Sequence, residues 1–374
     1  MRVLLLSAYD ASSHRYWRQL LTEQLSDWDW FELTLPARHF SWRMRGNALY
    51  WSQAEREVLQ QPFDLLLATS TVDLATLRGL HPTLTMLPTL LYFHENQFAY
   101  PASTRQVDSL EPQMVNLYTA LSAERVVFNS DYNRRTFLDG VSSLLAKLPD
   151  ATPGNVVSVL KDKARVLPVA LENECFSKSG ASDADSLSSE PLHVIWNHRW
   201  EYDKGPERLL RIVEHLLDTD IDFQISVVGE RFRQHPDAFA VLKQRLDRAG
   251  NRLQNWGYID AVDVYRRCLA MGDVVLSTAL HDFQGLSILE AVAAGCLPLV
   301  PERLCYPDWF GPEYLYGSSL DDAEGEALNV VRAIERLAKA KAAGTLPAPP
   351  SVMQLGWPAM QPQYAELLTA LAAH

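Results

Sequence analysis

The 374-residue chain has only four cysteines and lacks a Cys-x-x-Cys pair. This scarcity suits a reducing compartment and indicates neither a disulfide framework nor a metal site. The chain also lacks an apolar run long enough to span a membrane. Its first apolar run, Val3–Leu6, is too short for the core of a signal peptide, so we interpret it as a buried strand. We therefore expect a cytoplasmic protein. The four cysteines are Cys175, Cys268, Cys296 and Cys305.

The chain also has fewer positively than negatively charged residues. Lysine and arginine total 34 against 46 aspartates and glutamates, which gives a formal net charge of -12. Non-specific coating of nucleic acid needs broad neutralisation of phosphates, so this balance argues against that class of protein but still permits a local basic patch. A hydrophobic content of 47% with 21% charged residues indicates a folded chain, and its length suits two domains.

What the chain does have is a regular alternation of short apolar runs with amphipathic stretches, which is typical of parallel sheets covered by helices. In the first half we expect strands at Val3–Leu6, Leu65–Ala68, Leu90–Phe93, Val126–Phe128 and Val166–Val169. In the second half we expect strands at His193–Trp196, Phe223–Val228, Leu253–Trp256, Val274–Ser277 and Leu297–Val300. We expect helices at Pro206–Leu217, Ser287–Ala294, Val330–Ala343 and Gln361–Ala372.

The two halves are separated by a stretch rich in Ser, Asp and Ala, Ser177–Glu190, which indicates a linker. The expected fold class is therefore α/β, with two Rossmann-like domains facing each other across a cleft. We place the first domain at residues 1–176, the linker at 177–191 and the second domain at 192–350. Residues 351–374 should form a helical segment that packs back on the first domain.

A first group of chemically active residues spans Asn197 to Pro206. It follows a predicted strand and opens a predicted helix, a position where free backbone N–H groups and the helix dipole favour an anion. Arg199 and Lys204 add two cations there, and an arginine can hold a phosphate with two hydrogen bonds. A polar loop with a surface ion pair between Asp203 and Lys204 is the simpler alternative for such a pattern.

A second group, Ser277 to Ala291, repeats the arrangement: a strand ends, Gly285 permits close approach of the backbone, and a helix begins. Glu290 lies one turn inside that helix. A carboxylate there can accept hydrogen bonds from both hydroxyls of a ribose while the helix start holds a diphosphate. The alternative is an ordinary glutamate near a helix N-terminus, where it matches the dipole.

Together the two groups resemble the donor-binding motifs of family 4 glycosyltransferases, which have the GT-B fold. The resemblance implies that Arg199 and Lys204 hold the diphosphate of a nucleotide sugar and act in catalysis. It matches Glu290 to the second glutamate of a Glu-x7-Glu motif. Asp282 replaces the first glutamate with a carboxylate one methylene shorter, and is expected to contact the sugar and act in catalysis. The predicted donor-binding residues are Arg199, Lys204, Tyr258, Asp282, Gly285, Leu286, Ser287 and Glu290, and Tyr258 is the hypothesis for the base pocket.

The first half narrows the resemblance to the tRNA-queuosine alpha-mannosyltransferase family. The residues that carry it in the first half are Ser7–His14, Pro36–Arg38, Trp42–Arg45, Ala48–Ser52, His94–Gln97, Tyr100-Pro101 and Val127–Ser130. In the second half they are Trp196–Glu201, His281–Phe283 and Tyr306-Pro307. The chain departs from the pattern at Asp10–Ser13, where the resemblance implies a glycine-rich turn.

His94 follows a predicted buried strand, and glycosyltransferases of this type place a histidine there, over the donor sugar. The resemblance thus implies a catalytic role for His94, whereas a lone histidine after a strand is more often structural. The acceptor is expected to enter over Ser7–His14 and Arg38–Arg45. The predicted acceptor-binding residues are Ser12, Ser13, His14, Arg38, Trp42, Arg43, Arg45, Glu95 and Asn96.

The segment Arg38–Arg45 interleaves cations with aromatic residues. Such a pattern suits phosphate contacts with base stacking, contact with an anionic membrane surface, or simply a loop around a buried Trp42. Composition does not distinguish between these three alternatives. The family resemblance favours contact with RNA.

Three aspartate-rich stretches resemble the manganese motif of transferases with a different fold: Asp27-Trp28-Asp29, Asp183-Ala184-Asp185 and Asp218–Asp222. Each lies at a helix end or in the linker, so we interpret them as solvated charges. We predict no metal and no cofactor apart from the nucleotide sugar, because Arg199, Lys204 and helix N-termini can neutralise the leaving diphosphate.

The leading hypothesis is a retaining glycosyltransferase that moves mannose from GDP-mannose to queuosine in tRNA. GDP-mannose and queuosine are implied wholly by the resemblance. One alternative is a family 4 glycosyltransferase with a lipid, glycan or small-molecule acceptor. Another is a nucleotide-sugar-binding protein with the same fold and no activity. The sequence does not indicate an oligomeric state.

Overall fold

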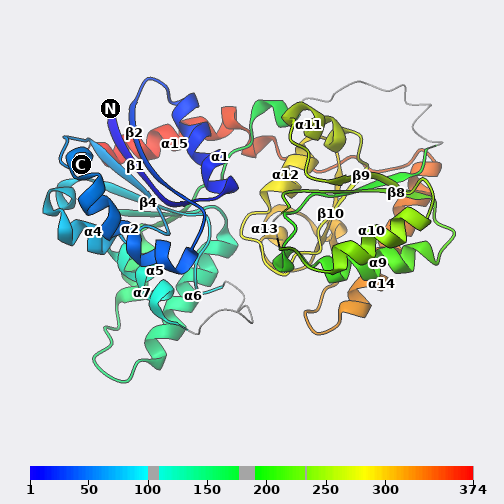
Figure 1. Ribbon diagram of the computed structural model, residues 1–374, viewed down its shortest axis with the longest axis horizontal. Coiled ribbons are helices and arrows are strands. Elements are labelled where there is room, and N and C mark those ends of the chain that lie inside the picture. Colours follow the sequence, from blue (N-terminus) through cyan, green and yellow to red (C-terminus); the bar gives the residue numbers. More distant parts are fainter. Residues whose placement is uncertain (100–108, 177–189, 232–233, 374) are drawn as a thin grey trace. The chain divides into compact units, whose positions relative to one another are not determined.

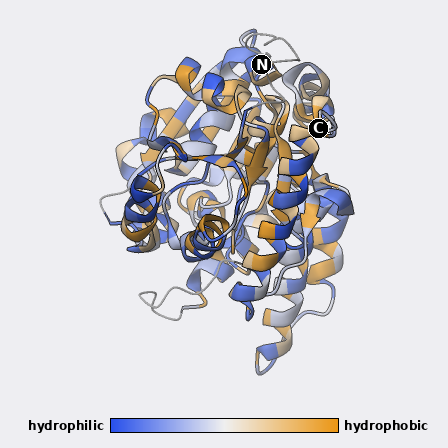
Figure 2. Ribbon diagram, turned by 90° about the vertical axis from the view of Figure 1, so that its right-hand side faces the viewer, coloured by the Kyte–Doolittle hydropathy of each residue, from blue (hydrophilic) through white to orange (hydrophobic). Residues whose placement is uncertain are grey.

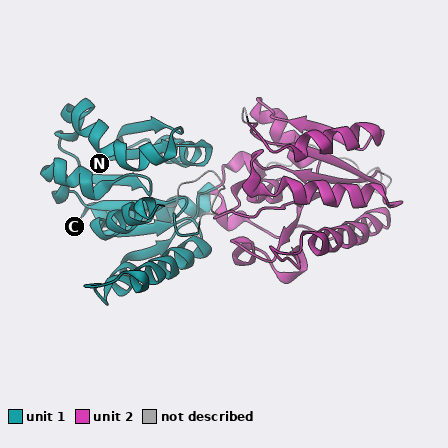
Figure 3. Ribbon diagram, turned by 60° about the horizontal axis from the view of Figure 1, so that its bottom comes forward, with its two compact units in different colours: residues 1–170, 357–374 teal, residues 171–356 magenta. Residues whose placement is uncertain are grey.

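The computed structural model describes residues 1–99, 109–176, 190–231 and 234–373 (Figure 1). The chain divides into two compact units (Figure 3). Unit 1 comprises Met1–Ala170 and Trp357–His374, and unit 2 comprises Leu171–Gly356. The C-terminal segment thus belongs with the N-terminal one. Most of the expected linker, and the motif Tyr100-Pro101, lie outside the described residues.

Unit 1 is built on a six-stranded parallel sheet with the order β2-β1-β3-β4-β5-β6. Its strands are β1 (Arg2–Asp10), β2 (Asp29–Pro36), β3 (Leu65–Thr69), β4 (Thr89–Phe93), β5 (Arg125–Phe128) and β6 (Ala164–Val166). The helices are α1 (Ser12–Gln24), α2 (Phe40–Ala54), α3 (Arg56–Leu59), α4 (Leu74–Leu80), η1 (Pro82–Met86), α5 (Glu111–Ser122), α6 (Asp131–Lys147), α7 (Val156–Lys163) and α15 (Trp357–Ala372).

Two strands of unit 1 depart from expectation. The edge strand β2 was not anticipated, because its outer side is solvated and its sequence mixes polar with apolar residues instead of forming an apolar run. The last strand was expected at Val166–Val169 but lies at Ala164–Val166. Pro168 explains part of that shift, since proline has no N–H to donate to a ladder.

Unit 2 repeats the architecture with a sheet of order β12-β11-β10-β7-β8-β9. Its strands are β7 (Leu192–Trp196), β8 (Phe223–Val228), β9 (Leu253–Gly257), β10 (Val274–Leu276), β11 (Leu297–Pro301) and β12 (Leu315–Tyr316). The α-helices are α9 (Pro206–Leu217), α10 (Ala238–Arg248), α11 (Val262–Ala270), α12 (Leu286–Ala293), α13 (Tyr306–Trp309) and α14 (Ala323–Ala342). The short 3-10 helices are η2 (Asn173–Phe176), η3 (Tyr202–Lys204), η4 (Pro312–Tyr314) and η5 (Met353–Leu355).

The helix expected at Val330–Ala343 begins earlier, at Ala323. The carboxylate of Asp322 caps its first turn by accepting a hydrogen bond from the Gly325 N–H at 2.8 Å. The two-residue strand β12 is too short to stand out in the sequence. Both differences concern local signals weaker than the buried apolar runs. Apart from β6, those runs were located to within one residue at each end, except that β1 continues four residues beyond the expected Leu6, to Asp10.

The cores explain why the strand ends carry the polar chemistry. Central strands such as β3, β4, β7 and β11 are buried along their whole length, and the helices carry alternating bands of polar and apolar residues (Figure 2). Polar side chains therefore gather where these strands end and the chain turns toward a helix. His94 follows β4, Asn197 follows β7, and Ser277 follows β10.

Candidate functional site

In unit 2 the loop after β7 turns into α9 at a left-handed glycine. Gly205 has φ +66°, and a Cβ on it would lie 2.2 Å from the Thr278 carbonyl oxygen. No side chain fits at that distance, so Gly205 lets the loop after β7 pack directly against the loop after β10. The two groups of residues singled out in the sequence are thereby brought together.

Hydrogen bonds join these two loops. The backbone carbonyl of Asp203 accepts from the N–H groups of Leu280 and His281 at 2.8 and 3.0 Å. The Thr278 hydroxyl donates to the Lys204 carbonyl at 2.8 Å. The loops that carry Lys204 and Asp282 thus form one rigid surface at the end of the sheet.

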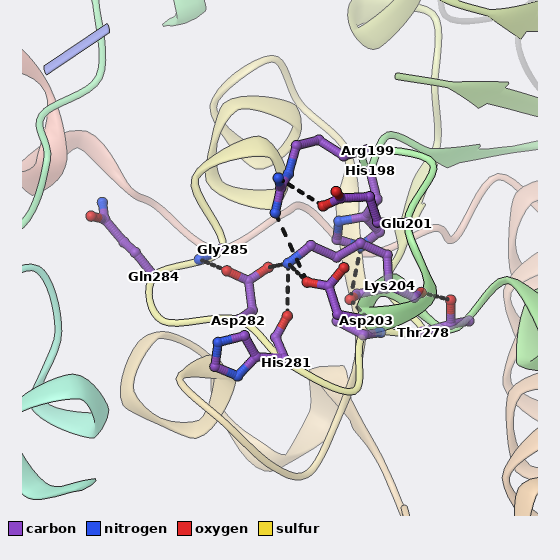
Figure 4. Close-up of polar contacts among 12 residues, drawn as sticks. His198, Arg199, Glu201, Asp203, Lys204, Thr278, His281, Asp282, Gln284 and Gly285 are labelled. Carbon is purple, nitrogen blue, oxygen red and sulfur yellow. Dashed lines mark hydrogen bonds and ion pairs between the residues drawn. The ribbon is translucent and has the colours of Figure 1, made fainter. Parts of the chain in front are cut away.

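Lys204 is the centre of this surface (Figure 4). Its side chain is 10% exposed, and its ammonium donates to the His281 carbonyl at 2.7 Å. The same nitrogen lies 3.3 Å from Asp203 Oδ2 and 3.5 Å from Asp282 Oδ2. Burial alone would lower the pKa of Lys204, but the two carboxylates raise it. Lys204 is therefore a fixed positive charge held at a strand end.

Asp282 is held at both carboxylate oxygens. Its Oδ1 accepts the Gly285 N–H at 2.9 Å, and its Oδ2 accepts the Tyr306 hydroxyl at 3.3 Å. Burial would raise the pKa of Asp282, but Lys204 and other nearby donors and charges bring it to about 2. Asp282 is consequently ionised at neutral pH and anchored to the start of α12.

Arg199 lies at the more open side of the group. Its side chain is 39% exposed, and Nη1 lies 2.7 Å from Glu201 Oε2 while Nη2 lies 3.9 Å from Asp203 Oδ2. Burial raises the pKa of Glu201. The simple surface pair considered from the sequence, Asp203 with Lys204, is thus one part of a larger charge cluster.

Glu290 lies in α12 beside a polar group that sequence reasoning did not single out. The Tyr265 hydroxyl donates to Glu290 Oε2 at 3.2 Å. Asn197 Nδ2 donates to Tyr265 Oη at 3.1 Å and to the Ser287 carbonyl at 2.7 Å, which ties the loop after β7 to α12. Burial raises the pKa of Glu290 to about 7, despite the hydrogen bond from Tyr265. The position of Asn197 directly after β7 was the one available signal.

The remaining predicted donor residues differ in their settings. Gly285 is the left-handed residue, φ +71°, that precedes α12, and Leu286 and Ser287 form the first turn of that helix. Tyr258 follows β9 and is 60% exposed. The structure therefore groups Gly285, Leu286 and Ser287 with Asp282 and leaves Tyr258 as an exposed ring.

In unit 1, His94 is enclosed by aromatic rings at the end of β4. The His14 ring stacks on it at 4.1 Å between centroids, and Trp17 and Tyr92 approach at 5.0 and 4.8 Å. Nε2 of His94 is buried and has no hydrogen-bond partner among the described residues. Burial, followed by the nearby His14, holds the pKa of His94 well below its ordinary value, so the ring is neutral at neutral pH.

The other residues predicted around His94 separate into buried and exposed ones. His14 is buried, and its Nε2 lies 2.9 Å from Glu95 Oε2. Asn96 is fully buried, and its side chain bonds within unit 1 to Asn133 and to neighbouring backbone. Ser12 and Ser13 are exposed at the start of α1. The side chains of Ser12 and Ser13 are thus accessible, whereas that of Asn96 is enclosed within unit 1.

The turn after β1 forms without the glycine that the family resemblance implied. Ala11 precedes α1 with φ -67° and ψ 169°, an extended conformation open to any residue. Arg18 pairs with Asp10 at 3.1 Å and also contacts Glu32, which fixes the end of β1. The chain therefore reaches α1 here by an ordinary extended residue.

The segment Arg38–Arg45 is mostly the first turn and a half of α2. Trp42 is 56% exposed, so the reading of a loop around a buried Trp42 is wrong. A Cβ on Gly46 would lie 2.4 Å from the indole, which shows that Trp42 lies directly over Gly46. Arg45 pairs with Asp73 at 2.6 Å and with Glu111 at 3.0 Å. Its charge is thus offset, while Arg38 is exposed.

Two kinds of feature are absent from the part of the chain that the structure describes. The described residues contain no group of three or more His, Cys, Asp or Glu side chains arranged to hold a metal ion. Among them, too, no helix combines the length and the apolar character that crossing a membrane requires. The aspartates of Asp27-Trp28-Asp29 and Asp218–Asp222 are exposed; the first stretch leads from α1 into the start of β2, and the second lies in the connection from α9 to β8. Asp183-Ala184-Asp185 lies outside the described residues.

Several solved structures share this architecture. HepE from Anabaena, in complex with UDP and glucose, is 14% identical with a TM-score of 0.67, covering 99% of this chain and 100% of that one. Sucrose-phosphate synthase from Thermosynechococcus elongatus is 16% identical with a TM-score of 0.66, covering 100% and 99% of the two chains. At these identities the likeness establishes the fold, which is the expected GT-B type.

Sequence comparison is more specific. Residues 2–171 match the family model described as tRNA-queuosine alpha-mannosyltransferase N-terminal. The chain is 33% identical over 324 residues to the tRNA-queuosine alpha-mannosyltransferase of Drosophila melanogaster, a match that covers 85% of this chain and 84% of that protein. The predicted family and enzyme class are both confirmed. The chain is a glycosyltransferase that belongs to the tRNA-queuosine alpha-mannosyltransferase family.

Proposed function

We propose that this enzyme transfers a mannosyl residue from GDP-mannose to queuosine in tRNA, with retention of configuration. The observation that carries the donor part is the joined surface of unit 2, where a buried Lys204 and the start of α12 lie in one hydrogen-bonded unit. Its relative from Drosophila melanogaster carries the acceptor in its name. Because the proposed acceptor is a tRNA, we also propose a cytoplasmic location.

The diphosphate of the donor is assigned to Lys204, Arg199 and the N–H groups at the start of α12. A buried ammonium beside a helix N-terminus favours a dianionic ligand, and Arg199 is exposed enough to meet it. Neutralising the leaving diphosphate in this way is electrostatic stabilisation of charge that develops during transfer. Leu286 and Ser287 supply the free N–H groups of the first helical turn.

The nucleoside and sugar are assigned to the residues around that diphosphate. Glu290 accepts hydrogen bonds from the ribose hydroxyls, and Tyr265 orients its carboxylate. Asp282 lies beside Lys204 on the sugar side, and the exposed ring of Tyr258 is the candidate for the base. These assignments follow the order diphosphate, ribose and base that a nucleotide sugar itself has.

In unit 1 we assign His94 to the transferred sugar and other residues of the unit to the acceptor. His94 is neutral, and its unpartnered ring nitrogen supports a hydrogen bond to a sugar hydroxyl. Trp42 and Arg38 offer a ring and a charge of the kind that contacts RNA bases and phosphates. The remaining acceptor residues in the proposal are Ser12, Ser13, His14, Arg43, Arg45, Glu95 and Asn96, with Asn96 acting through the fold.

The reaction then proceeds on one face of the sugar. The bond from the anomeric carbon to the diphosphate oxygen breaks, and a bond from that carbon to the acceptor hydroxyl oxygen forms on the same side. The acceptor proton passes to a donor phosphate oxygen, so the chain itself needs no general base. Lys204 and Arg199 stabilise the negative charge left on the diphosphate.

The test is incubation of the protein with queuosine-bearing tRNA and GDP-mannose, followed by mass spectrometry of the nucleosides. We expect a mass gain of one hexosyl residue on queuosine. tRNA that lacks queuosine is the matched control and should gain nothing. If no sugar nucleotide yields a mass gain on the nucleoside, the tRNA acceptor is wrong, and transfer to lipid or glycan acceptors becomes the alternative to measure.

A further inference from the structure

Four side chains of unit 2 form a continuous chain of hydrogen bonds that ends on Asp282. His198 Nε2 lies 2.9 Å from Ser277 Oγ, and Ser277 Oγ lies 2.7 Å from Tyr306 Oη. The Tyr306 hydroxyl then reaches Asp282 Oδ2 at 3.3 Å. The first three side chains are almost wholly buried. They come from the loop after β7, the end of β10 and the start of α13, so the chain links three distant parts of the sequence.

Counting protons fixes the direction of every bond in this chain. Asp282 has a pKa of about 2 and is ionised, so it can only accept, and the single hydroxyl proton of Tyr306 goes to it. Ser277 must then donate its own proton to Tyr306. It therefore accepts from His198, whose Nε2 must carry the ring proton. Burial, followed by the charge on Lys204, lowers the pKa of His198 to about 3, so that ring is neutral with one N–H.

We propose that His198, Ser277 and Tyr306 are positioning residues: their chain holds the Asp282 carboxylate in place and so keeps Lys204 ready for the donor diphosphate. The role assigned to Lys204 rests on the proposed function of unit 2. All the bond dipoles of the chain point toward the carboxylate, and hydrogen bonds aligned in this way reinforce one another.

The geometry at Asp282 Oδ2 shows what the chain achieves. This oxygen is shared by the Tyr306 hydroxyl at 3.3 Å and the Lys204 ammonium at 3.5 Å. A closed ammonium–carboxylate hydrogen bond spans about 2.7–2.9 Å. In the proposal, the hydroxyl occupies one side of this oxygen and restrains the carboxylate from closing on Lys204. The ammonium keeps its charge next to two acids while its bond to Asp282 stays long enough to give way to a phosphate oxygen.

Gly285 supports the same arrangement from the other side. Its N–H binds Asp282 Oδ1 at 2.9 Å, so the carboxylate is fixed at both oxygens. A Cβ at this position would lie 2.9 Å from Tyr306 Cε1, and the residue has φ +71°. Only glycine both adopts this conformation without strain and leaves room for the Tyr306 ring. The start of α12, the carboxylate and the tyrosine are thus fitted to one another.

A second buried tyrosine of unit 2 provides a matched control for the hydroxyl of Tyr306. Tyr316 is also buried in unit 2, and its hydroxyl donates to the backbone carbonyl of Ser277 at 2.9 Å. Tyr306→Phe and Tyr316→Phe therefore each remove one buried hydroxyl that bonds the same serine. Both should lower the Tm to a similar extent, since each leaves a buried acceptor with one donor fewer. Only the first removes a hydrogen bond to Asp282.

The experiment measures the binding of GDP and UDP to the wild type and to these two variants of the 374-residue chain by isothermal titration calorimetry. For the nucleoside diphosphate that the wild type binds, we expect Tyr306→Phe to raise the Kd by about tenfold. Tyr316→Phe should change the same Kd by less than about twofold. Ser277→Ala, which breaks the chain one step earlier, should also raise the Kd. An unchanged Kd in Tyr306→Phe, or an equal loss in Tyr316→Phe, would overturn the proposal.

A spectroscopic measurement separates this proposal from the donor assignment. If the wild type binds neither GDP nor UDP, the placement of the donor diphosphate is wrong, while the hydrogen-bonded chain is still decided by the tautomer of His198. Nitrogen-15 spectra of the histidine side chains should show His198 with its proton on Nε2, assigned by its loss in His198→Gln. A proton on Nδ1 instead would reverse the first bond and overturn the chain.

Discussion

The two strand-end sites of this enzyme differ in charge and in the kind of side chain that surrounds them. In unit 2 the end of the sheet carries Lys204 and Arg199 among three carboxylates, and hydrogen bonds join the two loops that bear them. In unit 1 the corresponding strand end carries His94 within a set of stacked rings, with its pKa lowered by burial. One site is a fixed charge cluster and the other is a neutral group in an aromatic wall.

The contrast follows from what each site is proposed to hold. A diphosphate requires fixed positive charge, and a buried lysine can keep its charge only when carboxylates accompany it. A sugar hydroxyl requires a neutral hydrogen-bonding group of defined orientation, and packed rings fix an imidazole without adding charge. Variants of the two sites should therefore fail in different ways, first through charge and then through orientation.

The largest effect is expected for Lys204→Met in unit 2. It removes the ammonium but keeps the side-chain volume, and leaves Asp203 and Asp282 without their shared cation. We expect transfer to fall by about 10³-fold, because one charged group that stabilises the leaving diphosphate is lost. Stability should fall by about 3–5 kcal/mol, as for other broken buried ion pairs. Steady-state kinetics and thermal unfolding measure the two effects.

A second buried lysine separates charge from stability. Lys341 in α14 pairs with Asp273 and donates to the Pro191 carbonyl at 3.1 Å, in the same unit. Lys341→Met should lower the Tm by a comparable amount and leave donor binding intact in the protein that remains folded. If both variants lose nucleotide binding equally, the special role of Lys204 is contradicted.

The next effect concerns the neutral site of unit 1. His94→Gln keeps a hydrogen-bonding group but loses the stacked ring, so its orientation relaxes. We expect kcat to fall by about 10–100-fold, the value of one well-placed hydrogen bond in a transition state, with KM for the donor changing little. His81→Gln is the matched control, since His81 is a buried histidine of unit 1 that bonds the Ser52 carbonyl at 3.2 Å. Equal losses of kcat in the two variants would remove His94 from the reaction.

A smaller effect, with an unusual sign, is expected at Glu290 in unit 2. Its pKa is about 7 in the folded protein against an ordinary 4.5. A raised pKa contributes stability that is fully present below pH 4.5 and is lost as the pH rises through 7. Glu290→Gln should therefore stabilise the free protein at pH 8 by about 1–2 kcal/mol, allowing for partial exposure, and the gain should vanish toward pH 4.5. Donor KM should rise about tenfold.

Another buried glutamate of unit 2 checks this sign. Glu326 is paired with Arg208 at 2.7 Å and also with Arg303. Glu326→Gln removes a partner from two arginines, so it should destabilise the protein at pH 8, where Glu290→Gln stabilises it. Thermal unfolding at pH 5 and pH 8 distinguishes the two. A destabilised Glu290→Gln at pH 8 would contradict the cost assigned to its buried charge.

Within both sites, some residues could be predicted from the sequence and others could not. The buried strands are continuous apolar runs, so the residues that follow them, His94 and Arg199, could be located at once. The network of Tyr265 and Tyr306 could not, because it depends on which strand ends the fold brings together. The burial of Asn96 was hidden for the same reason: an amide in a loop shows its partners only in three dimensions.

The helices and strands also differ in how well the sequence predicts them. Central strands and α9 were located closely because burial on both faces of a strand leaves a continuous apolar run, and burial of one helix stripe leaves a periodic pattern. The edge strand β2 and the two-residue β12 carry no such signal. The pairing of the C-terminal segment with unit 1 rests on contacts between residues more than 190 positions apart, as in Tyr364 with Pro168.

The smallest expected effect tests that pairing at the neutral site. The Tyr364 hydroxyl of α15 accepts a hydrogen bond from Trp17 Nε1 at 3.2 Å and donates to the Pro168 carbonyl at 2.8 Å. Trp17 and Tyr92 are two of the rings that enclose His94, and Tyr92 Oη lies 3.3 Å from the same hydroxyl. Tyr364→Phe should therefore cost about 1 kcal/mol of stability.

The same change should lower kcat by about twofold to threefold, because the ring of Trp17 loses its anchor and His94 loses some of its orientation. Trp17→Phe, which removes the indole N–H as well, is the companion variant, and it should not lose more when combined with Tyr364→Phe. Additive losses of kcat would mean that the hydroxyl and the indole act separately. In that case α15 stabilises unit 1 without orienting His94, and the aromatic site depends only on the rings that touch it.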